Sequence, residues 1–496
     1  MMKGKRAGYR LWWMLAAVAL PVAGVYWAVC HRARPAFDPA PFAPDVGRVA
    51  ALREAAKDAN VVVVVIDAAR ADHVGCYGYP RETTPDIDRL AQESAVFERH
   101  FCQHVTTKPS TACLLTSQYT DTHLATGTRH LLEGTFTISE ALEAAGFRTV
   151  LFSSNPNASP GAGIGLEFQE TYDQGDVEPL VGGWEEFTSP AALLTLVERW
   201  VKRHRRARFF MYIHFDPPHQ PYIQPEEMTK LFEGQQPPDF EAGDFAFPVG
   251  DREMLRDCLR PPLPEWINLY DANLRYADWA IGEVARLLRE AGILERTLFI
   301  VTADHGEAFG EHGYLWHERG VYEELARVPL LIRWPGGERP PQRTRALTQA
   351  VDLLPTICDI FEAPYPRTGI QGRSLLPLMA GLTDEVHDYV FCRSDGDPPS
   401  YLVRSPNWAL MLWGNGEWRA LYDLEADPGQ QKNVVAERPE VAAELLEAFR
   451  SFALQQRRPP LDFLDPEAHL PPLPQAGESE LTPEMTKRLR ALGYVR

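Results

Sequence analysis

Carboxylate and imidazole side chains follow two apolar runs of this chain. Asp67 comes directly after residues 60–66, and Asp304 and His305 come just after residues 298–302. If both runs are parallel strands, their carboxyl ends meet at one edge of a sheet, where ligands bind in open α/β folds. Carboxylate and imidazole together suit a divalent cation. A lone aspartate after a strand is more often a helix N-cap, so the metal prediction depends on convergence of the three residues.

Short apolar runs alternate with amphipathic segments through most of the chain, as parallel strands alternate with helices. Residues 273–290, for example, carry apolar side chains at three- and four-residue steps, which predicts a helix. We therefore expect an α/β domain over residues 59–383, with a large, mostly parallel sheet sandwiched by helices. Its expected strands are residues 60–66, 149–152, 208–215, 298–302 and 328–333.

A change of pattern near residue 382 predicts a second, smaller part of the chain. Residues 384–496 are expected to form an α+β lobe with short strands and a helix that begins at Pro439. The expected elements are strands 388–392, 408–413 and 418–424, and helices 439–455 and 483–492.

The N-terminus carries the one strong targeting signal. Basic residues precede an uncharged run over residues 11–29, whose length of about 28 Å as a helix approaches the thickness of a bilayer core. We expect a signal anchor over residues 1–30, a Pro/Ala-rich linker over 31–58, and a catalytic domain held at the membrane on the periplasmic or extracellular side. The alternative is a cleaved signal peptide, and both export the chain.

Composition excludes several classes of protein. The chain has 496 residues with 50 Lys and Arg against 68 Asp and Glu, a net charge of −18 that disfavours nucleic acid as a partner. Its seven cysteines form no C-x-x-C pair, which argues against a zinc ribbon or a thioredoxin-like site.

Five segments resemble, in order, the motifs of bacterial sulfatases, a branch of the alkaline phosphatase superfamily. They are residues 66–78 (IDAARADHVGCYG), 107–116 (TKPSTACLLT), 214–222 (HFDPPHQPY), 302–307 (TADHGE) and 421–428 (LYDLEADP). The resemblance runs from about residue 60 to the end of the chain. It implies an alkaline phosphatase-like fold and a metal held by Asp67, Asp304 and His305. The ion would be Ca²⁺ in a typical sulfatase, with Mn²⁺, Zn²⁺ or Mg²⁺ as alternatives.

The same resemblance assigns roles to residues around that metal. Thr107 stands at the nucleophile position and would also be a metal ligand, since a cation has to lower the pKa of a hydroxyl before it attacks at neutral pH. His219 and His317 would donate a proton to the leaving oxygen or a hydrogen bond to the anion. Lys108 and His214 are candidates for substrate binding.

Three positions depart from the family pattern. Thr107 replaces the cysteine or serine from which sulfatases make formylglycine, so no formylglycine is expected here. Thr111 replaces the motif arginine, and Ala68 replaces a second metal-binding aspartate. A G-K-W-H-L-G segment that binds sulfate in many relatives is also missing, with residues 152–156 in its place.

The sequence thus predicts a metal-dependent hydrolase that cleaves sulfate esters, or related phosphate or phosphonate esters, by double displacement through Thr107. The substrate would be a small anionic ester, a glycan or a lipid head group. One alternative is a phosphodiesterase or a membrane phosphoethanolamine-type transferase, and a second is an anion-binding pseudoenzyme. The oligomeric state is left open.

Overall fold

The computed structural model describes residues 46–126, 134–177, 189–222, 224–238, 263–313, 315–317, 320–337, 343–395, 399–413, 418–458 and 460. Residues 48–496 form one compact unit, and the site discussed below lies within it. The expected helix over residues 483–492 falls outside the described residues. The boundary expected between residues 383 and 384 stays a prediction.

The prediction of a membrane-anchored chain needs correction. It relied on residues 11–29, which lie outside the described residues. Among the residues that the structure does describe, no helix is both long enough and apolar enough to cross a bilayer. The membrane location, and the periplasmic or extracellular placement that depended on it, are therefore withdrawn.

A nine-stranded sheet forms the core of the catalytic part, in the order β11-β2-β10-β6-β1-β5-β3-β4, with β9 paired to β2. The central strand β1 (Asn60–Ile66) is parallel to both of its neighbours, β5 (Phe209–Phe215) and β6 (Thr297–Ala303). Strand β10 is antiparallel to its neighbours, and β9 is antiparallel to β2. The remaining strands are β2 (Ser94–Phe101), β3 (Arg148–Ser153), β4 (Glu170–Tyr172), β9 (Arg327–Val328), β10 (Leu330–Arg333) and β11 (Arg343–Gln349). The predicted mostly parallel α/β sheet is confirmed.

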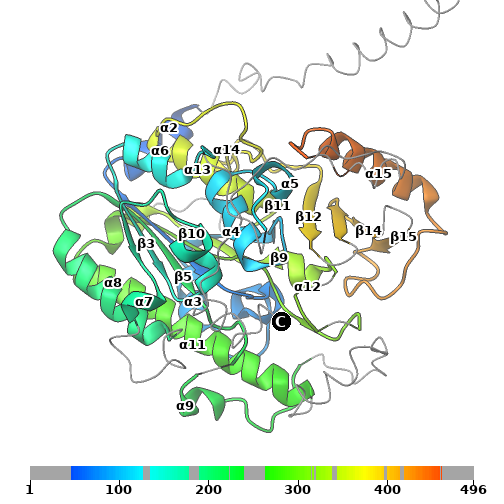
Figure 1. Cartoon of the computed structure of the whole chain (residues 1–496), viewed down its shortest axis with the longest axis horizontal. Helices are drawn as coiled ribbons and strands as arrows, with labels where there is room; N and C mark the ends of the chain where they lie inside the picture. Colours follow the sequence, from blue (N-terminus) through cyan, green and yellow to red (C-terminus); the bar gives the residue numbers. More distant parts are fainter. Residues whose placement is uncertain are drawn as a thin grey trace, which may run out of the picture. The chain divides into compact units, whose positions relative to one another are not determined.

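Helices cover both faces of this sheet (Figure 1). Side chains of β1 alternate between two apolar clusters, so that every residue of the strand is buried and all of its positions past Asn60 are valine or isoleucine. One face packs on α3 (Pro85–Ala91), α8 (Pro190–His204) and α11 (Leu263–Glu290). The other packs on α2 (Val46–Ala56), α4 (Thr107–Thr116), α6 (Ile138–Ala144), α13 (Leu353–Phe361) and α14 (Leu376–Met379).

Shorter elements connect these layers at the edges. They are α5 (Thr120–His123), α7 (Gln174–Val177), α9 (Glu226–Thr229), α12 (Glu323–Ala326), β7 (Ala308–Phe309) and β8 (Leu315–Trp316). Strands β7 and β8 form a separate two-stranded antiparallel hairpin. This hairpin lies between the sequence motifs that contain His305 and His317, and so it turns the second histidine back toward the first.

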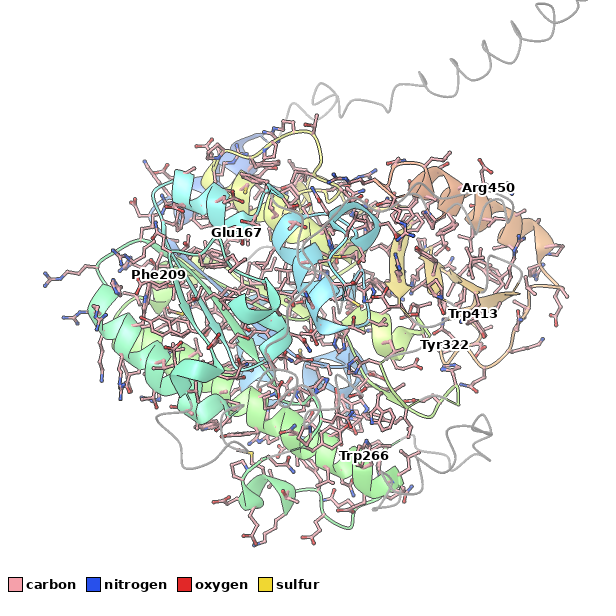
Figure 2. All side chains as sticks on the ribbon, viewed as in Figure 1. Glu167, Phe209, Trp266, Tyr322, Trp413 and Arg450 are labelled. Atoms are coloured by element: carbon pink, nitrogen blue, oxygen red, sulfur yellow. The ribbon has the colours of Figure 1, made fainter. Side chains whose placement is uncertain are left out.

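A four-stranded antiparallel sheet and one long helix make up the C-terminal lobe, seen in yellow and orange in Figure 1. Its elements are β12 (Val390–Ser394), β13 (Ser400–Arg404), β14 (Trp408–Trp413), β15 (Trp418–Asp423) and α15 (Pro439–Ala453). The predicted small lobe is confirmed, although β13 was not foreseen. Aromatic contacts attach it to the larger part: Tyr322 lies 6.5 Å from Trp413 between ring centroids (Figure 2).

Gly306 has no room for a side chain. A Cβ atom there would lie 1.9 Å from the Glu324 carbonyl oxygen, while the Gly306 N–H donates to the Leu325 carbonyl at 2.8 Å. We expect Gly306→Ala to push α12 away and to lower the free energy of unfolding by about 1–3 kcal/mol or more, measured by thermal and denaturant unfolding. Gly429→Ala is the control, because its Cβ would meet only ordinary contacts. Equal melting temperatures for the two variants would contradict this packing.

Candidate active site

The carboxyl ends of neighbouring strands bring the predicted metal residues together. Asp67 follows β1, while Asp304 and His305 follow β6, and one ligand atom from each lies within 4.8 Å of the others. All three residues are buried. The convergence predicted from two apolar runs is thus what the parallel pairing of β1 with β6 produces.

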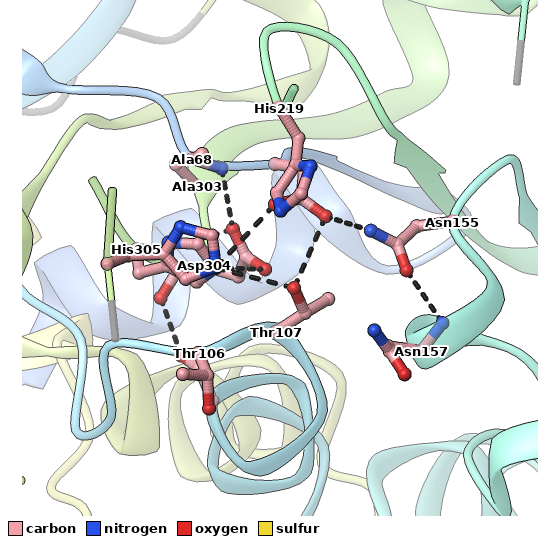
Figure 3. A network of polar contacts seen from close by, with 12 residues as sticks. Ala68, Thr106, Thr107, Asn155, Asn157, His219, Ala303, Asp304 and His305 are labelled. Atoms are coloured by element: carbon pink, nitrogen blue, oxygen red, sulfur yellow. Dashed lines mark hydrogen bonds and ion pairs between the residues drawn. The ribbon is translucent and has the colours of Figure 1, made fainter. Parts of the chain in front are cut away.

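Backbone N–H groups fix the orientation of Asp304. Its Oδ1 accepts from the Ala68 N–H at 3.1 Å and from the His305 N–H at 2.9 Å (Figure 3). Ala68 can present its N–H this way because it adopts a left-handed backbone with φ of 55°, which is unfavourable for alanine. The Tyr270 hydroxyl donates to the Ala68 carbonyl at 2.8 Å and holds this turn.

Thr107 lies at the first turn of helix α4, with its hydroxyl directed at the metal residues. Its Oγ1 is 3.5 Å from Asp67 Oδ2 and 3.3 Å from His305 Nε2 (Figure 3). Ser110 Oγ donates to the Asp304 carbonyl at 2.5 Å and so ties the helix to the end of β6. The helix N-terminus adds a positive potential that favours an anion at this place.

The buried carboxylates need a compensating positive charge. Burial and the neighbouring charges of Asp304 and Asp216 raise the pKa of Asp67 well above its usual value, and burial raises the pKa of Asp304 to about 6. Among the described residues, Asp67 Oδ1 and Asp304 Oδ2 have no hydrogen-bond partner. Two inward-facing oxygens without donors fit a cation.

His305 has the ring orientation of a metal ligand. Its Nδ1–H donates to the Gly306 carbonyl at 2.9 Å, which leaves the lone pair of Nε2 toward the carboxylates, 3.6 Å from Asp67 Oδ1 and 3.5 Å from Asp304 Oδ2. Burial holds the pKa of His305 well below its usual value, so that the ring is neutral. The residues present therefore fit a divalent ion bound by two carboxylates and an imidazole.

His214, predicted as a substrate-binding residue, lies instead against the carboxylates. It belongs to β5, and its Nε2 is 3.3 Å from Asp67 Oδ2 and 3.8 Å from Asp304 Oδ2. Its Nδ1 lies 3.2 Å from the Tyr212 hydroxyl, and burial lowers its pKa to about 4. His214 thus lies beside the two predicted metal carboxylates, and its role in substrate binding stays a prediction.

The two predicted proton donors, His219 and His317, lie close to each other, and His317 also lies against His305. Their ring centroids are 5.0 Å apart, and that of His317 is 4.4 Å from the His305 ring. Burial lowers the pKa of His219 to about 3 and that of His317 to about 4. His317 Nδ1 is 3.2 Å from Glu307 Oε1, and burial raises the pKa of this carboxyl to about 7.

Lys108 brings a cation to the same helix turn as Thr107. Its side chain is buried, and among the described residues it has neither a hydrogen-bond nor an ion-pair partner. Burial lowers the pKa of its ammonium group to about 8. A buried ammonium group without a counter-charge fits the predicted role in anion binding.

Two polar residues near the metal carboxylates were not foreseen as site residues. Asn155 follows β3, and its Nδ2 donates to Asp67 Oδ2 (Figure 3). Asp216 follows β5, is buried, and raises the pKa of Asp67 through its charge. The same signal that found Asp67, a polar residue just past the carboxyl end of a strand, would have found both.

Comparison with known proteins decides the family. The family model described as Sulfatase matches residues 59–363, more than half of the chain, and a second model, described as N-sulphoglucosamine sulphohydrolase, C-terminal, matches residues 310–455. The chain belongs to the sulfatase family. It is accordingly a sulfatase-like sulfuric ester hydrolase, and the resemblance seen in five sequence motifs is confirmed.

Individual relatives are distant but cover most of this sulfatase-family chain. N-acetylglucosamine-6-O-sulfatase of Bacteroides thetaiotaomicron is 23% identical over 468 residues, covering 77% of this chain and 83% of the relative. Human arylsulfatase A is 25% identical, and the alignment covers 80% of this chain and 88% of arylsulfatase A. The phosphonate monoester hydrolase of Agrobacterium radiobacter superposes with a TM-score of 0.68 at 22% identity, over 80% of this chain and 96% of that structure.

The charge on Asp304 should be needed to hold the metal. We expect Asp304→Asn to lower metal content and metal affinity by at least about tenfold, because a neutral amide replaces a ligand that also orders the Ala68 turn. Metal content after dialysis, measured by elemental analysis, tests this. Asn157→Ala is the matched control, since Asn157 contacts Asn155 through its backbone N–H, which alanine retains. Full metal content in Asp304→Asn would remove the assignment.

The ammonium group of Lys108 should set an alkaline limit on substrate capture. It is charged below a pKa of about 8 and neutral above it, so kcat/KM for an anionic ester should fall as the pH rises through about 8. Lys108→Arg should remove this fall, because a guanidinium stays protonated. A pH profile from 6 to 10 for both forms is the measurement. A decline of the same midpoint in the arginine variant would exclude Lys108 as its source.

Proposed function

We propose that this sulfatase-family chain is a metal-dependent hydrolase that cleaves its ester by double displacement, with Thr107 as the nucleophile. The observation that carries the proposal is the position of Thr107 Oγ1, between Asp67 Oδ2 at 3.5 Å and His305 Nε2 at 3.3 Å. Among the described residues, no other hydroxyl lies within hydrogen-bond distance of both groups. Thr106 Oγ1, the nearest rival in sequence, faces His104 Nδ1 at 3.0 Å.

Asp67, Asp304, His305 and the Thr107 hydroxyl would hold the ion. A bound divalent cation would lower the pKa of the hydroxyl and neutralise charge on the ester oxygens. The donor set includes imidazole, which Mn²⁺ and Zn²⁺ accept more readily than Ca²⁺ does. We therefore expect Mn²⁺ or Zn²⁺ rather than the Ca²⁺ of a typical sulfatase.

The two steps divide between the residues of this chain. In the first, Thr107 Oγ forms a bond to the sulfur or phosphorus atom while the bond to the leaving oxygen breaks; the hydroxyl proton passes by way of His219 or His317 to that oxygen, and Lys108 balances the charge of the oxyanion. In the second, water must attack the adduct, because a threonine ester has no second hydroxyl on the same carbon to expel the group; the bond to Thr107 Oγ breaks, and one proton of the water returns to that oxygen by the same route. His219 donates its Nδ1–H to the Gln220 carbonyl at 2.5 Å, so Nε2 is the nitrogen of this ring through which the proton would pass.

Two observations bear on the substrate. Relatives named for sulfated sugars support a sulfate ester on a glycan. Thr107, which excludes formylglycine, and the likeness to phosphonate monoester hydrolases support phosphate or phosphonate esters as the second candidate. An anion-binding pseudoenzyme is not supported, because a hydroxyl still stands at the nucleophile position and Asp67, Asp304 and His305 still lie together as possible metal ligands, although Ala68 replaces a further aspartate.

Loss of the Thr107 hydroxyl should abolish turnover. We expect Thr107→Ala to lower kcat by several powers of ten with the melting temperature maintained, and Thr107→Ser to keep partial activity, since only the methyl group that restricts the rotamer is lost. Mass spectrometry should locate a trapped adduct on residue 107. An adduct on Thr106 or Ser110, or full activity in Thr107→Ala, would refute the mechanism.

The substrate class is tested in the same assay. Purified protein, stripped of metal and reloaded separately with Mn²⁺, Zn²⁺ and Ca²⁺, is given an aryl sulfate, a phosphomonoester, a phosphodiester and a phosphonate ester. A sulfate ester should give the highest kcat/KM if the glycan sulfatase assignment is right. A phosphodiester or phosphonate ester with the highest value would favour the second candidate.

A further inference from the structure

A buried histidine precedes the proposed nucleophile by three residues and contacts the C-terminal lobe. His104 is fully buried, and its Nε2 lies 3.3 Å from Asp395 Oδ1, just past strand β12. Its Nδ1 accepts from the Thr106 backbone N–H at 3.2 Å. A nitrogen that accepts carries no proton, so this geometry assigns the ring proton to Nε2, the nitrogen that faces the Asp395 carboxylate.

Thr106 is the residue whose conformation fixes where α4 begins. It is the N-cap of α4, with φ of −134° and ψ of 150°, and its own side chain makes no capping bond. Its carbonyl accepts the first bond of the helix, from the Ser110 N–H at 3.1 Å. His104 thus binds the one backbone N–H that lies immediately before Thr107, and it does so from outside the helix.

The backbone of the same segment is paired with the C-terminal lobe. His104 forms a parallel bridge with Arg393 of β12, in which the Arg393 N–H donates to the Gln103 carbonyl at 3.1 Å and the Val105 N–H donates to the Arg393 carbonyl at 3.2 Å. The lobe therefore fixes both the main chain and the side chain of the segment that leads into α4.

Charged groups in turn hold Asp395 in place. Arg393 Nη2 lies 3.1 Å from Asp395 Oδ1, and Arg393 Nη1 pairs with Asp121 of α5. The Tyr401 hydroxyl of β13 donates to Asp121 Oδ2 at 2.9 Å. Asp395 keeps 31% of its side-chain exposure, whereas His104 has none. The chain of contacts runs from the lobe to the nucleophile helix.

We propose that His104 and Asp395 are positioning residues, through which the C-terminal lobe aims the Thr107 hydroxyl at the metal residues. The inference rests on the proposed role of Thr107 as nucleophile. Lobe attachment alone does not need this pair, because Arg404 Nε donates to Glu323 at 2.9 Å elsewhere in the same interface. A misplaced nucleophile slows the chemical step while substrate and metal still bind.

Four variants test the pair with kcat, KM, metal content and melting temperature as readouts. His104→Ala should lower kcat by about 10²-fold and Asp395→Ala by about tenfold, with KM and metal content within about threefold of the parent. His104→Asn should recover part of kcat, because its amide oxygen can accept the Thr106 N–H, whereas His104→Gln should not. Tyr389→Phe is the control beside the same lobe, because its hydroxyl donates to Glu444 of α15 at 2.9 Å rather than to the groups that hold Asp395, and it should keep the parent kcat below its melting temperature.

Each outcome either supports or overturns the positioning role of His104 and Asp395. Parent-like kcat in His104→Ala, or an equal loss in Tyr389→Phe, would overturn the positioning role, as would recovery by glutamine rather than asparagine. If His104→Ala does not fold, the more exposed Asp395→Ala carries the test, and parent-like kcat there overturns the proposal. Thr107→Ala separates the two hypotheses: if it is active, the proposed function fails, and if it is inactive while His104→Ala is normal, only the positioning role fails.

Discussion

Two carboxylates of like charge, on Asp67 and Asp304, lie side by side at the ends of adjacent parallel strands and are shielded from water. Such a pair is stable only with a proton or a cation between the groups. The surrounding structure orients these groups as the proposed metal ligands. The Ala68 N–H and the His305 N–H both donate to Asp304, and the unprotonated Nε2 of His305 faces the carboxylates. Helix α4 is then placed against the same charge by Ser110.

The replacement of an aspartate by Ala68 changes the charge balance of the family's site. With one carboxylate fewer, the site presents less negative charge to an incoming oxyanion, although the nearby charge of Asp216 still raises the pKa of Asp67. Ala68 nevertheless keeps the left-handed backbone that aspartate tolerates better than alanine. The strained turn is stabilised by the hydrogen bond from its N–H to the Asp304 carboxylate.

Sequence patterns predicted the features that depend on local order. The two apolar runs predicted β1 and β6 and hence Asp67, Asp304 and His305, and the family motif predicted Thr107. Strands β2 and β11 were missed because polar and charged residues interrupt their apolar stretches: Glu98, Arg99 and His100 follow the apolar part of β2, and β11 begins Arg-Thr-Arg and has only two apolar residues. His104 was missed for a different reason. Its partner Asp395 is distant in the chain and belongs to the other lobe, so no local spacing of residues predicts the contact.

Strand β1 sits in the middle of the sheet, yet both of its partners come much later in the chain. Val61 pairs with Phe210 and with Leu298, and the Ala68 N–H reaches a carboxylate 236 residues away. A chain emerging from the ribosome must therefore keep one edge of this apolar strand unpaired until β6, which lies beyond the midpoint of the 496 residues, has been made. Parallel pairing over such separations is slow and exposes strand edges meanwhile. Because the strand order that assembles this site leaves an edge of β1 exposed during synthesis, we expect the nascent chain to need chaperones.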